Sequence, residues 1–280
     1  MKRKSLNVQK PKRTFTNNIK FQNLYSKFVK VINKHKIKNS FVVAVSGGPD
    51  SLALTGLSKF FTNQKKIKVF FVLVDHGLRK KSSEEAFNVK NLLRKNNIKL
   101  DILKNKIKIS KNIQKNARDI RYKLLSSYCK RKAVKFLLTA HHQDDQIETF
   151  FIRLSRGSGI EGLSSMNEKT TITGKINLIR PFLDIKKEDL ISVAKNIFGK
   201  VFKDPANKNT KFLRTNIRNL KKILQKRGLK PDSIAHSIQN ISKTKDAINF
   251  YVTKSMQRLV KIKKNETILD LKNFRKEPDE

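Results

Sequence analysis

Strand-like and helix-like patterns alternate along residues 41–156, and this alternation restricts the fold more than any other feature of the sequence. Short apolar segments have the length of buried strands, and longer amphipathic segments follow them. The strand-like segments are 41–45, 68–77, 98–104 and 135–142, and the helix-like segments after the last three are 82–97, 112–133 and 144–156. The alternation predicts an α/β fold, a parallel sheet flanked by helices on both faces.

Three polar clusters stand where predicted strands end. They are Ser46-Gly47-Gly48-Pro49-Asp50-Ser51, Asp75-His76-Gly77 and His141-His142-Gln143-Asp144-Asp145. In open α/β sheets, ligands bind beyond the carboxyl ends of the strands. We therefore expect the three clusters to converge on one crevice.

The first cluster joins a strand to a helix through two glycines. Gly47 and Gly48 permit a tight turn and close backbone approach, and helical spacing resumes at Leu52. Free amides and the helix dipole at such a helix start favour a phosphate, and Ser46 and Ser51 can add donors. The Walker pattern GxxxxGK[ST] is absent. The alternative is a plain strand-to-helix turn capped by Asp50 or Ser51.

Carboxylates beside this loop indicate a metal ion. Asp50 would repel bound phosphates unless it holds a cation, so we expect Mg²⁺ to bridge Asp50 and a polyphosphate. Asp145 and Glu148 lie three residues apart at the start of a helix, and their oxygen ligands also suit magnesium. Two alternatives remain at the third cluster. One is a zinc site of His141, His142 and Asp145. The other is an acidic first turn of a helix with exposed histidines.

The charge balance indicates a polyanionic partner. The chain has 280 residues with 64 Lys plus Arg against 22 Asp plus Glu, a formal net charge of +42. That excess is far more than solubility requires and favours nucleic-acid binding. Much of it is lysine in a chain also rich in asparagine and isoleucine, so compositional drift is an alternative source.

Cysteine content and hydropathy limit the remaining classes. The single cysteine, Cys129, excludes an intramolecular disulfide and an all-cysteine zinc or iron–sulfur site within one chain. No run of about 18 apolar residues occurs, and residues 1–13 have no apolar segment behind their charges. Neither a membrane span nor a secretory signal is indicated, and we expect a cytoplasmic protein.

The pattern divides the chain into three parts. Residues 1–17 are basic and polar and are expected to form a flexible arm. Residues 18–218 carry the alternating segments, beginning with a helix at about 18–36, and segment 82–97 opens with a predicted serine cap and an acidic first turn. Residues 219–280 are expected to form a small basic helical domain. The final segment resembles the opening of a further helix, so the chain could be cut short.

An ordered series of motifs resembles one family. SGGPDS resembles the SGGxDS loop of the N-type ATP pyrophosphatases, which split ATP between its α and β phosphates. Further motifs resemble, in order, those of the tRNA(Ile)-lysidine synthetases. These are VDHGLR (74–79), ARDIRY (117–122), TAHHQDDQIET (139–149), RGSGIEGL (156–163), IRPFLDIKKEDL (179–190) and FKDPANKNTKFLRTNIR (202–218). Lys203 and Ala206 depart from the family's usual glutamate and serine, which leaves the detail of that loop open.

The resemblance implies a fold, a reaction and its substrates. The fold would be like that of the adenine nucleotide α-hydrolases, and the enzyme would be a ligase that forms a carbon–nitrogen bond. The wobble cytidine of tRNA(Ile) with a CAU anticodon would be adenylated by ATP at its C2 oxygen, with release of pyrophosphate. Free L-lysine would then displace AMP to give lysidine. The C-terminal domain would grip the tRNA away from the anticodon.

The resemblance also assigns roles to residues. Residues 46–51 would hold the polyphosphate of ATP, with Mg²⁺ on Asp50 and Asp145. Arg121 and Arg214 are catalytic candidates beside the phosphates or the base, although either could be exposed surface that contacts phosphates. His141 would contact the cytidine. Asp145 and Glu148 would receive the lysine ammonium and help to deprotonate it, since a carboxylate that pairs with an ammonium can accept its proton.

Three other classes remain as alternatives. An enzyme that activates a nucleobase for ammonia generally needs a glutaminase and has no reason for this charge. An enzyme that activates a tRNA base for sulfur transfer relies on cysteines, of which the chain has one. A basic RNA-binding module with a relict fold would have no reason to retain the polar residues of the crevice.

Overall fold

The computed structural model describes residues 18–79, 81–107, 109, 111–173, 175–202, 213–263 and 266–275. The predicted arm, residues 1–17, lies outside the described residues, and so does the loop with Lys203 and Ala206. The described chain forms two compact units. Unit 1 comprises the described parts of Met1–Gln146 and Met166–Thr215, and unit 2 comprises those of Ile147–Ser165 and Asn216–Glu280.

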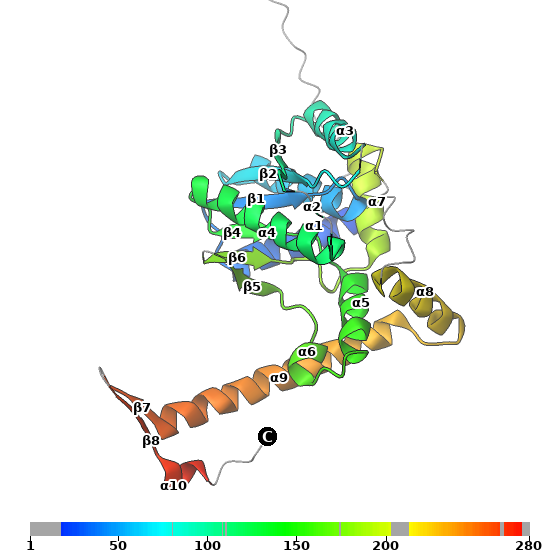
Figure 1. Ribbon diagram of the computed structural model, residues 1–280. Helices are drawn as coiled ribbons and strands as arrows, with labels where there is room; N and C mark the ends of the chain where they lie inside the picture. The colour runs from blue at the N-terminus through cyan, green and yellow to red at the C-terminus, as the bar shows by residue number, and fades with distance from the viewer. Residues whose placement is uncertain are drawn as a thin grey trace, which may run out of the picture. The chain divides into compact units, whose positions relative to one another are not determined.

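Unit 1 contains a six-stranded sheet in the order β3-β2-β1-β4-β6-β5 (Figure 1). Its strands are β1 (Ser40–Val45), β2 (Lys68–Asp75), β3 (Leu100–Lys104), β4 (Phe136–Leu138), β5 (Lys169–Ile172) and β6 (Ile176–Ile179). Five strands pair in parallel and β5 runs antiparallel to β6 at the edge. The predicted α/β class is confirmed.

Strand β1 lies between β2 and β4 and is buried along most of its length. Its residues Phe41, Val42 and Val43 are 0% exposed, as expected for a strand with helices on both faces. Val43 pairs with Phe71 of β2 and with Leu138 of β4. The loops that leave β1 and β4 therefore emerge side by side at the same edge of the sheet.

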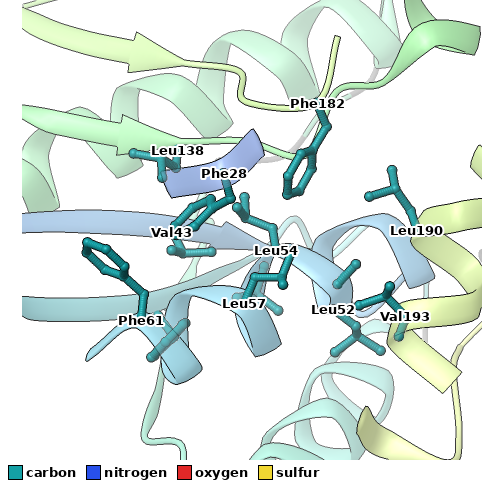
Figure 2. Close-up of a cluster of buried hydrophobic side chains, with 14 of the residues drawn as sticks. Phe28, Val43, Leu52, Leu54, Leu57, Phe61, Leu138, Phe182, Leu190 and Val193 are labelled. Carbon is teal, nitrogen blue, oxygen red and sulfur yellow. The ribbon is translucent and has the colours of Figure 1, made fainter. Parts of the chain in front are cut away.

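Helices cover both faces of this sheet. In unit 1 they are α1 (Ile19–Lys34), α2 (Pro49–Gln64), α3 (Ser82–Lys95), α4 (Ile113–Arg131) and α7 (Lys187–Phe198). One hydrophobic cluster unites α1, α2, α3 and α7 with one face, and Figure 2 shows Phe28, Leu54 and Val193 within it. A second cluster packs α4 against the other face.

The start of α3 corrects one prediction. The expected serine cap is wrong, because Lys81 is the N-cap residue and no side chain caps the helix. Ser83 Oγ instead donates to Asp75 Oδ2 at 2.7 Å. The carboxylate of Asp75 at the end of β2 thus accepts a hydrogen bond from the first turn of α3.

Two helices cross from one unit to the other along the chain. Helix α5 (Gln143–Leu154) begins in unit 1 and continues in unit 2, and α8 (Leu213–Lys226) does the same. The predicted division at residues 218 and 219 lies near the start of the second segment of unit 2 at Asn216. Unit 2 also includes residues 147–165, which the sequence reasoning kept with the sheet.

Unit 2 is mainly helical. It contains α6 (Ile160–Leu163), α9 (Pro231–Leu259) and α10 (Leu271–Phe274), with a hairpin of β7 (Val260–Ile262) and β8 (Thr267–Leu269). Its hydrophobic cluster consists of Ile147, Ile234 and Ile238, with Phe150 and Phe151 packed against them. Proline at the first turn of α9 fits the helix start, where its missing N–H costs nothing. No described helix is long and apolar enough to cross a membrane.

Candidate active site

The candidate site lies in unit 1, where the loops after β1 and β4 meet. The first loop, residues 46–48, leads from β1 into α2, and the second, residues 139–142, leads from β4 into α5. Strand pairing places these two loops next to each other. The first and third predicted clusters are thus brought together.

The loop of residues 46–51 is organised by Ser51. Ser51 Oγ accepts from the Ser46 amide and from Ser46 Oγ, both at 3.1 Å, and donates to the Gly48 carbonyl at 3.0 Å. The N-cap residue of α2 is Gly48, no side chain caps the helix, and Pro49 follows at its first turn. The alternative of a turn capped by Asp50 or Ser51 is therefore wrong. The start of a 16-residue helix without a side-chain cap suits an anion.

Gly47 is required by backbone shape and by space. Its φ is +83°, a conformation that side chains other than glycine rarely adopt. A Cβ here would lie 2.5 Å from Val89 Cγ2 of α3. The Gly47 carbonyl also accepts a long hydrogen bond of 3.4 Å from the Phe202 amide. The loop is thus held tightly against its neighbours.

Asp50 presents a carboxylate with one oxygen unused. Its Oδ2 lies 3.6 Å from His142 Nε2, and its side chain is 26% exposed. Its Oδ1 is buried and has no hydrogen-bond partner among the described residues. Because a buried carboxylate oxygen without a partner is costly, this atom fits a site for a cation.

His142 lies between two carboxylates. It is 3% exposed, and its Nε2 lies 3.6 Å from Asp50 Oδ2 and 3.5 Å from Asp145 Oδ2. Its Nδ1 accepts from the Asp144 amide at 3.2 Å. Burial alone would lower the pKa of His142, but Asp50 and Asp145 outweigh it and raise the pKa above its usual value. The alternative of exposed histidines is wrong for this residue.

Asp145 is held in its ionised form. Its Oδ2 accepts from the His142 amide at 3.1 Å, and its Oδ1 lies 3.3 Å from Arg214 Nη2. Burial would raise its pKa, but His142, His141 and Arg214 together lower it below the usual value. The structure thus brings Arg214, predicted from its motif, into direct contact with Asp145.

His141 has the opposite electrostatic setting to His142. Burial, supported by the guanidinium groups of Arg180, Arg118 and Arg214, lowers its pKa to about 3, although Asp145 opposes the change. Its Nδ1 lies 2.9 Å from Thr139 Oγ1. At neutral pH this imidazole is uncharged, and the contact with Thr139 orients the ring.

The second predicted cluster shapes the turn after β2. Asp75 accepts from the Gly77 amide at 3.0 Å and from Ser83 Oγ. Burial would raise the pKa of Asp75, but these hydrogen bonds lower it. Burial and the charge of Arg121 lower the pKa of His76. The charge of Arg121 in α4 thus acts on His76 in the turn after β2.

Glu148 has a partner that sequence reasoning missed. It is 3% exposed and makes a two-pronged ion pair in unit 2, with 2.6 Å from Arg218 Nε to Oε1 and 3.2 Å from Arg218 Nη2 to Oε2. Arg218 ends the last motif of the family resemblance and lies four residues after Arg214, which was the available signal. His142 was likewise given no role beyond the zinc alternative.

The donor set does not suit zinc. The described residues contain no group of three or more His, Cys, Asp or Glu side chains that could hold a metal ion, so the zinc alternative finds no support. Mg²⁺ commonly uses one or two carboxylates together with substrate phosphates. Of the two predicted ligands, Asp50 fits better, because both oxygens of Asp145 already face donors.

Comparisons with known proteins agree with the family resemblance of the motifs. The family described as PP-loop domain matches residues 17–226. A tRNA(Ile)-lysidine synthase from Wolbachia pipientis wMel is 38% identical over 80% of this chain and 53% of its own length. Another from Zymomonas mobilis is 32% identical over 88% of this chain and 74% of its own. The chain therefore belongs to the PP-loop family and, within it, to the family of the tRNA(Ile)-lysidine synthases.

Two further findings set the extent of this similarity. The chain spans about half the length of several curated relatives that it matches, for example 53%, 41% and 50%. A U34-tRNA thiolase from Methanococcus maripaludis, solved with its 4Fe–4S cluster, superimposes with a TM-score of 0.67 and 17% identity. The alignment covers 80% of this chain and 79% of that one. That likeness concerns the fold alone.

Proposed function

We propose that this protein ligates lysine to the wobble cytidine of tRNA(Ile) with a CAU anticodon. In the first step the C2 oxygen of the cytidine attacks the α-phosphate of ATP, and pyrophosphate leaves. In the second step the side-chain amine of lysine attacks C2, AMP leaves and a proton is released. The observation that carries the proposal is the uncapped start of α2 next to the unpartnered Oδ1 of Asp50, in a chain of this family.

The loop would bind the polyphosphate. Backbone amides at the start of α2 and the helix dipole favour negative charge there, and Gly47 and Gly48 let the phosphates approach the backbone. Ser46 and Pro49 complete the loop, and Ser51 keeps it in shape. Asp50, with Asp145 as a second candidate, would hold Mg²⁺. When bound, this ion would neutralise charge that builds on the leaving pyrophosphate.

Arginine and histidine side chains would orient the substrates. We assign Arg214 and Arg121 to the phosphates or the base. Arg214 Nη2 lies 3.3 Å from Asp145 Oδ1, and the charge of Arg121 acts on His76 in the second predicted cluster. His141 is uncharged, and its Nδ1 faces Thr139. Its Nε2 is then the ring atom for a hydrogen bond to the edge of the cytidine, where a neutral imidazole can donate or accept.

Two carboxylates are candidates to receive the lysine ammonium, Asp145 in unit 1 and Glu148 in unit 2. Asp145 is ionised because its pKa is lowered, so it suits the anchoring of a cation better than the removal of its proton. Glu148 shares its two oxygens with Arg218. An ammonium at Glu148 would therefore share the carboxylate with Arg218, because each carboxylate oxygen can accept a second hydrogen bond.

The direct test is a reconstitution with defined substrates. The full chain would be incubated with ATP, labelled L-lysine and an unmodified tRNA(Ile) transcript with a CAU anticodon. We expect label in the tRNA and one AMP per lysine incorporated. A transcript with uridine at the wobble position is the matched control and should remain unlabelled. AMP formation without lysine transfer would reject the proposed second step.

Cys129 tests whether the attacking group is an amine or sulfur. The residue is 0% exposed, and burial raises its pKa to about 12, so no reactive thiolate is present at neutral pH. Cys129→Ser should retain adenylation and lysine transfer, with at most a modest loss of stability. A variant that forms the adenylate but fails to complete the modification would implicate a thiol and would contradict the proposal.

We further assign residues 219–280 to contact with the tRNA and place the reaction in the cytoplasm, where ATP, lysine and tRNA occur together. The charge of +42 supports a polyanionic partner. Lysine and arginine contacts release counterions from phosphates, so affinity for tRNA should fall steeply as salt rises. The preference for cytidine over other bases should depend less on salt concentration than the affinity does, because base contacts specify sequence. If the affinity for tRNA did not change with salt concentration, compositional drift would be the better explanation of the net charge.

A further inference from the structure

The second half of α9 has almost no packed side. The helix buries Ile234, Ala235 and Ile238 near its start and Leu259 at its end. Between Lys245 and Leu259 every residue is exposed except Ser255, which is half-buried. Figure 1 shows α6 beside the earlier part of α9, and β7 and α10 contact only its far end. A helical stretch of this length is marginal in water without a partner for one of its faces.

Two aromatic rings lie in this stretch. Phe250 is 64% exposed and Tyr251 is 65% exposed. Their rings meet edge to face, with centroids 5.5 Å apart and planes at 81°, so they do not stack on each other. Large aromatic side chains are usually buried, and exposed rings in a group mark a binding surface.

Cations share a face with these rings. Lys254 follows Phe250 by four residues and Tyr251 by three, and Arg258 follows Lys254 by four, so the four side chains line one side of the helix. Both cations are exposed. Lys245 differs in exposure, because it is only 6% exposed. We call Phe250, Tyr251, Lys254 and Arg258 the aromatic–basic face.

The charge around this face favours one kind of partner. Residues 233–265 carry seven Lys or Arg and a single acidic residue, Asp246. A second copy of the chain would bring like charges together, which opposes association. Aromatic rings flanked by cations are what unpaired nucleotides need, because bases stack on the rings and phosphates contact the cations.

We propose that the aromatic–basic face of α9 binds unpaired nucleotides of RNA. Phe250 and Tyr251 stack on bases, while Lys254 and Arg258 contact the adjoining phosphates. The proposal rests on the proposed function in that the RNA is the tRNA substrate, and it names a contact with unpaired bases in addition to the reacting cytidine. A surface that bound RNA by charge alone would need Lys254 and Arg258 but not the two rings.

The test compares two double variants of the full chain. Phe250→Ala with Tyr251→Ala removes the rings, and Ile248→Ala with Val252→Ala is the matched control. The control residues are 43% and 53% exposed and lie on roughly the opposite side of the same helix. Binding is measured to the tRNA transcript, to a single-stranded oligoribonucleotide and to a blunt RNA duplex.

The ring variant should bind the single strand and the tRNA about 10-fold or more weakly, as expected for lost base stacking. Its affinity for the duplex and that of the control variant for all three probes should stay unchanged. Replacing Lys254 and Arg258 by Gln should weaken both RNA forms and lower the salt slope for the single strand by about 1.4. Circular dichroism checks that α9 remains helical in each variant.

Several outcomes would overturn the proposal. One is unchanged single-strand affinity in the ring variant. Another is an equal loss with the control variant, or a loss that sedimentation traces to dissociation of a dimer. Vesicles of anionic lipid serve as an additional probe, and a loss confined to them would assign the face to a membrane surface. If the wild-type protein transfers no lysine but the ring variant binds RNA more weakly, the proposed reaction is rejected and the proposed RNA-binding surface is supported. If transfer succeeds and the rings do not matter, only this inference fails.

Discussion

Helix α5 and the second half of α9 depart from the usual distribution of residues in opposite directions. Around α5, charged groups are buried: His142 and Glu148 are each 3% exposed. On α9, Phe250 and Tyr251 are more than 60% exposed. Charges are rarely buried without partners, and large rings rarely lie in water in a group. Each departure marks a surface at which something is expected to bind.

The two regions differ in what is fixed before a partner arrives. Near α5, Arg214 and Arg218 already hold Asp145 and Glu148, so the charges are oriented in advance. On α9 the two rings meet edge to face and remain largely exposed. Changes near α5 should therefore affect chemistry and stability, whereas changes on α9 should affect binding alone.

The largest effect is expected at Asp50. Asp50→Asn removes the charge that we assign to Mg²⁺ and pyrophosphate release, so tRNA-dependent AMP formation should fall by on the order of a hundredfold or more. Release of AMP from labelled ATP measures it. Asp184→Asn is the control, because Asp184 is exposed and pairs with Lys27 on the surface. Wild-type turnover in Asp50→Asn would remove Asp50 from the mechanism.

The next effect is expected at the buried pair in unit 2. Arg218→Met leaves the carboxylate of Glu148 buried without its partner, which should cost about 3 kcal/mol in the free energy of unfolding. Adding Glu148→Gln should recover part of this loss, because the charge is then gone. Urea unfolding of the single and double variants measures both. Equal stability of Arg218→Met and wild type would show that the pair contributes nothing to the fold.

The pH dependence of stability should separate the two neighbouring histidines. The pKa of His141 in the folded protein, about 3, lies below its usual 6.5, so its contribution to stability is lost as pH falls below 6.5. At pH 5 this loss is about 2 kcal/mol at most. The pKa of His142 is raised, so its contribution is present below pH 6.5 and is lost as pH rises through the folded pKa.

Urea unfolding at pH 7 and pH 5 tests this opposition. In His141→Gln the loss of stability between the two pH values should shrink. In His142→Gln the same loss should grow, because the stabilisation that His142 provides at low pH is gone. Identical changes in the two variants would mean that their environments do not differ as described.

The smallest effect is expected on α9. Phe250→Ser together with Tyr251→Ser should change the free energy of unfolding by less than about 0.5 kcal/mol for each residue, because exposed side chains contribute little to folding. Thermal unfolding measures it. A loss of 2 kcal/mol or more would show that the rings pack against something in the folded chain, and would weaken the contrast with α5.

Much of unit 1 followed from the sequence. The apolar segment before Ser46 and the one before His141 predicted strands, and the parallel-sheet rule predicted that the clusters after them would meet. The meeting was confirmed by the pairing of β1 with β4. The ordered motifs predicted the family, which the comparisons confirmed.

The partners of the site residues did not follow from the sequence. A pattern places Glu148 on a helix, but it does not show that Arg218, 70 residues later, reaches it. Nor does it show that His142 lies between Asp50 and Asp145, whereas His141 contacts Thr139. These contacts depend on side-chain directions across different elements. The serine cap predicted for segment 82–97 failed for a similar reason, since Ser83 of α3 donates to Asp75 at the end of β2.

The burial of Cys129 has a practical consequence. The chain has one native cysteine, and that thiol is 0% exposed. Maleimide reagents need an accessible thiolate, so the native protein should stay unlabelled while it is folded. A cysteine introduced at an exposed position such as Thr253 would then be the single labelling point. A fluorophore placed there could report on α9 in otherwise wild-type protein.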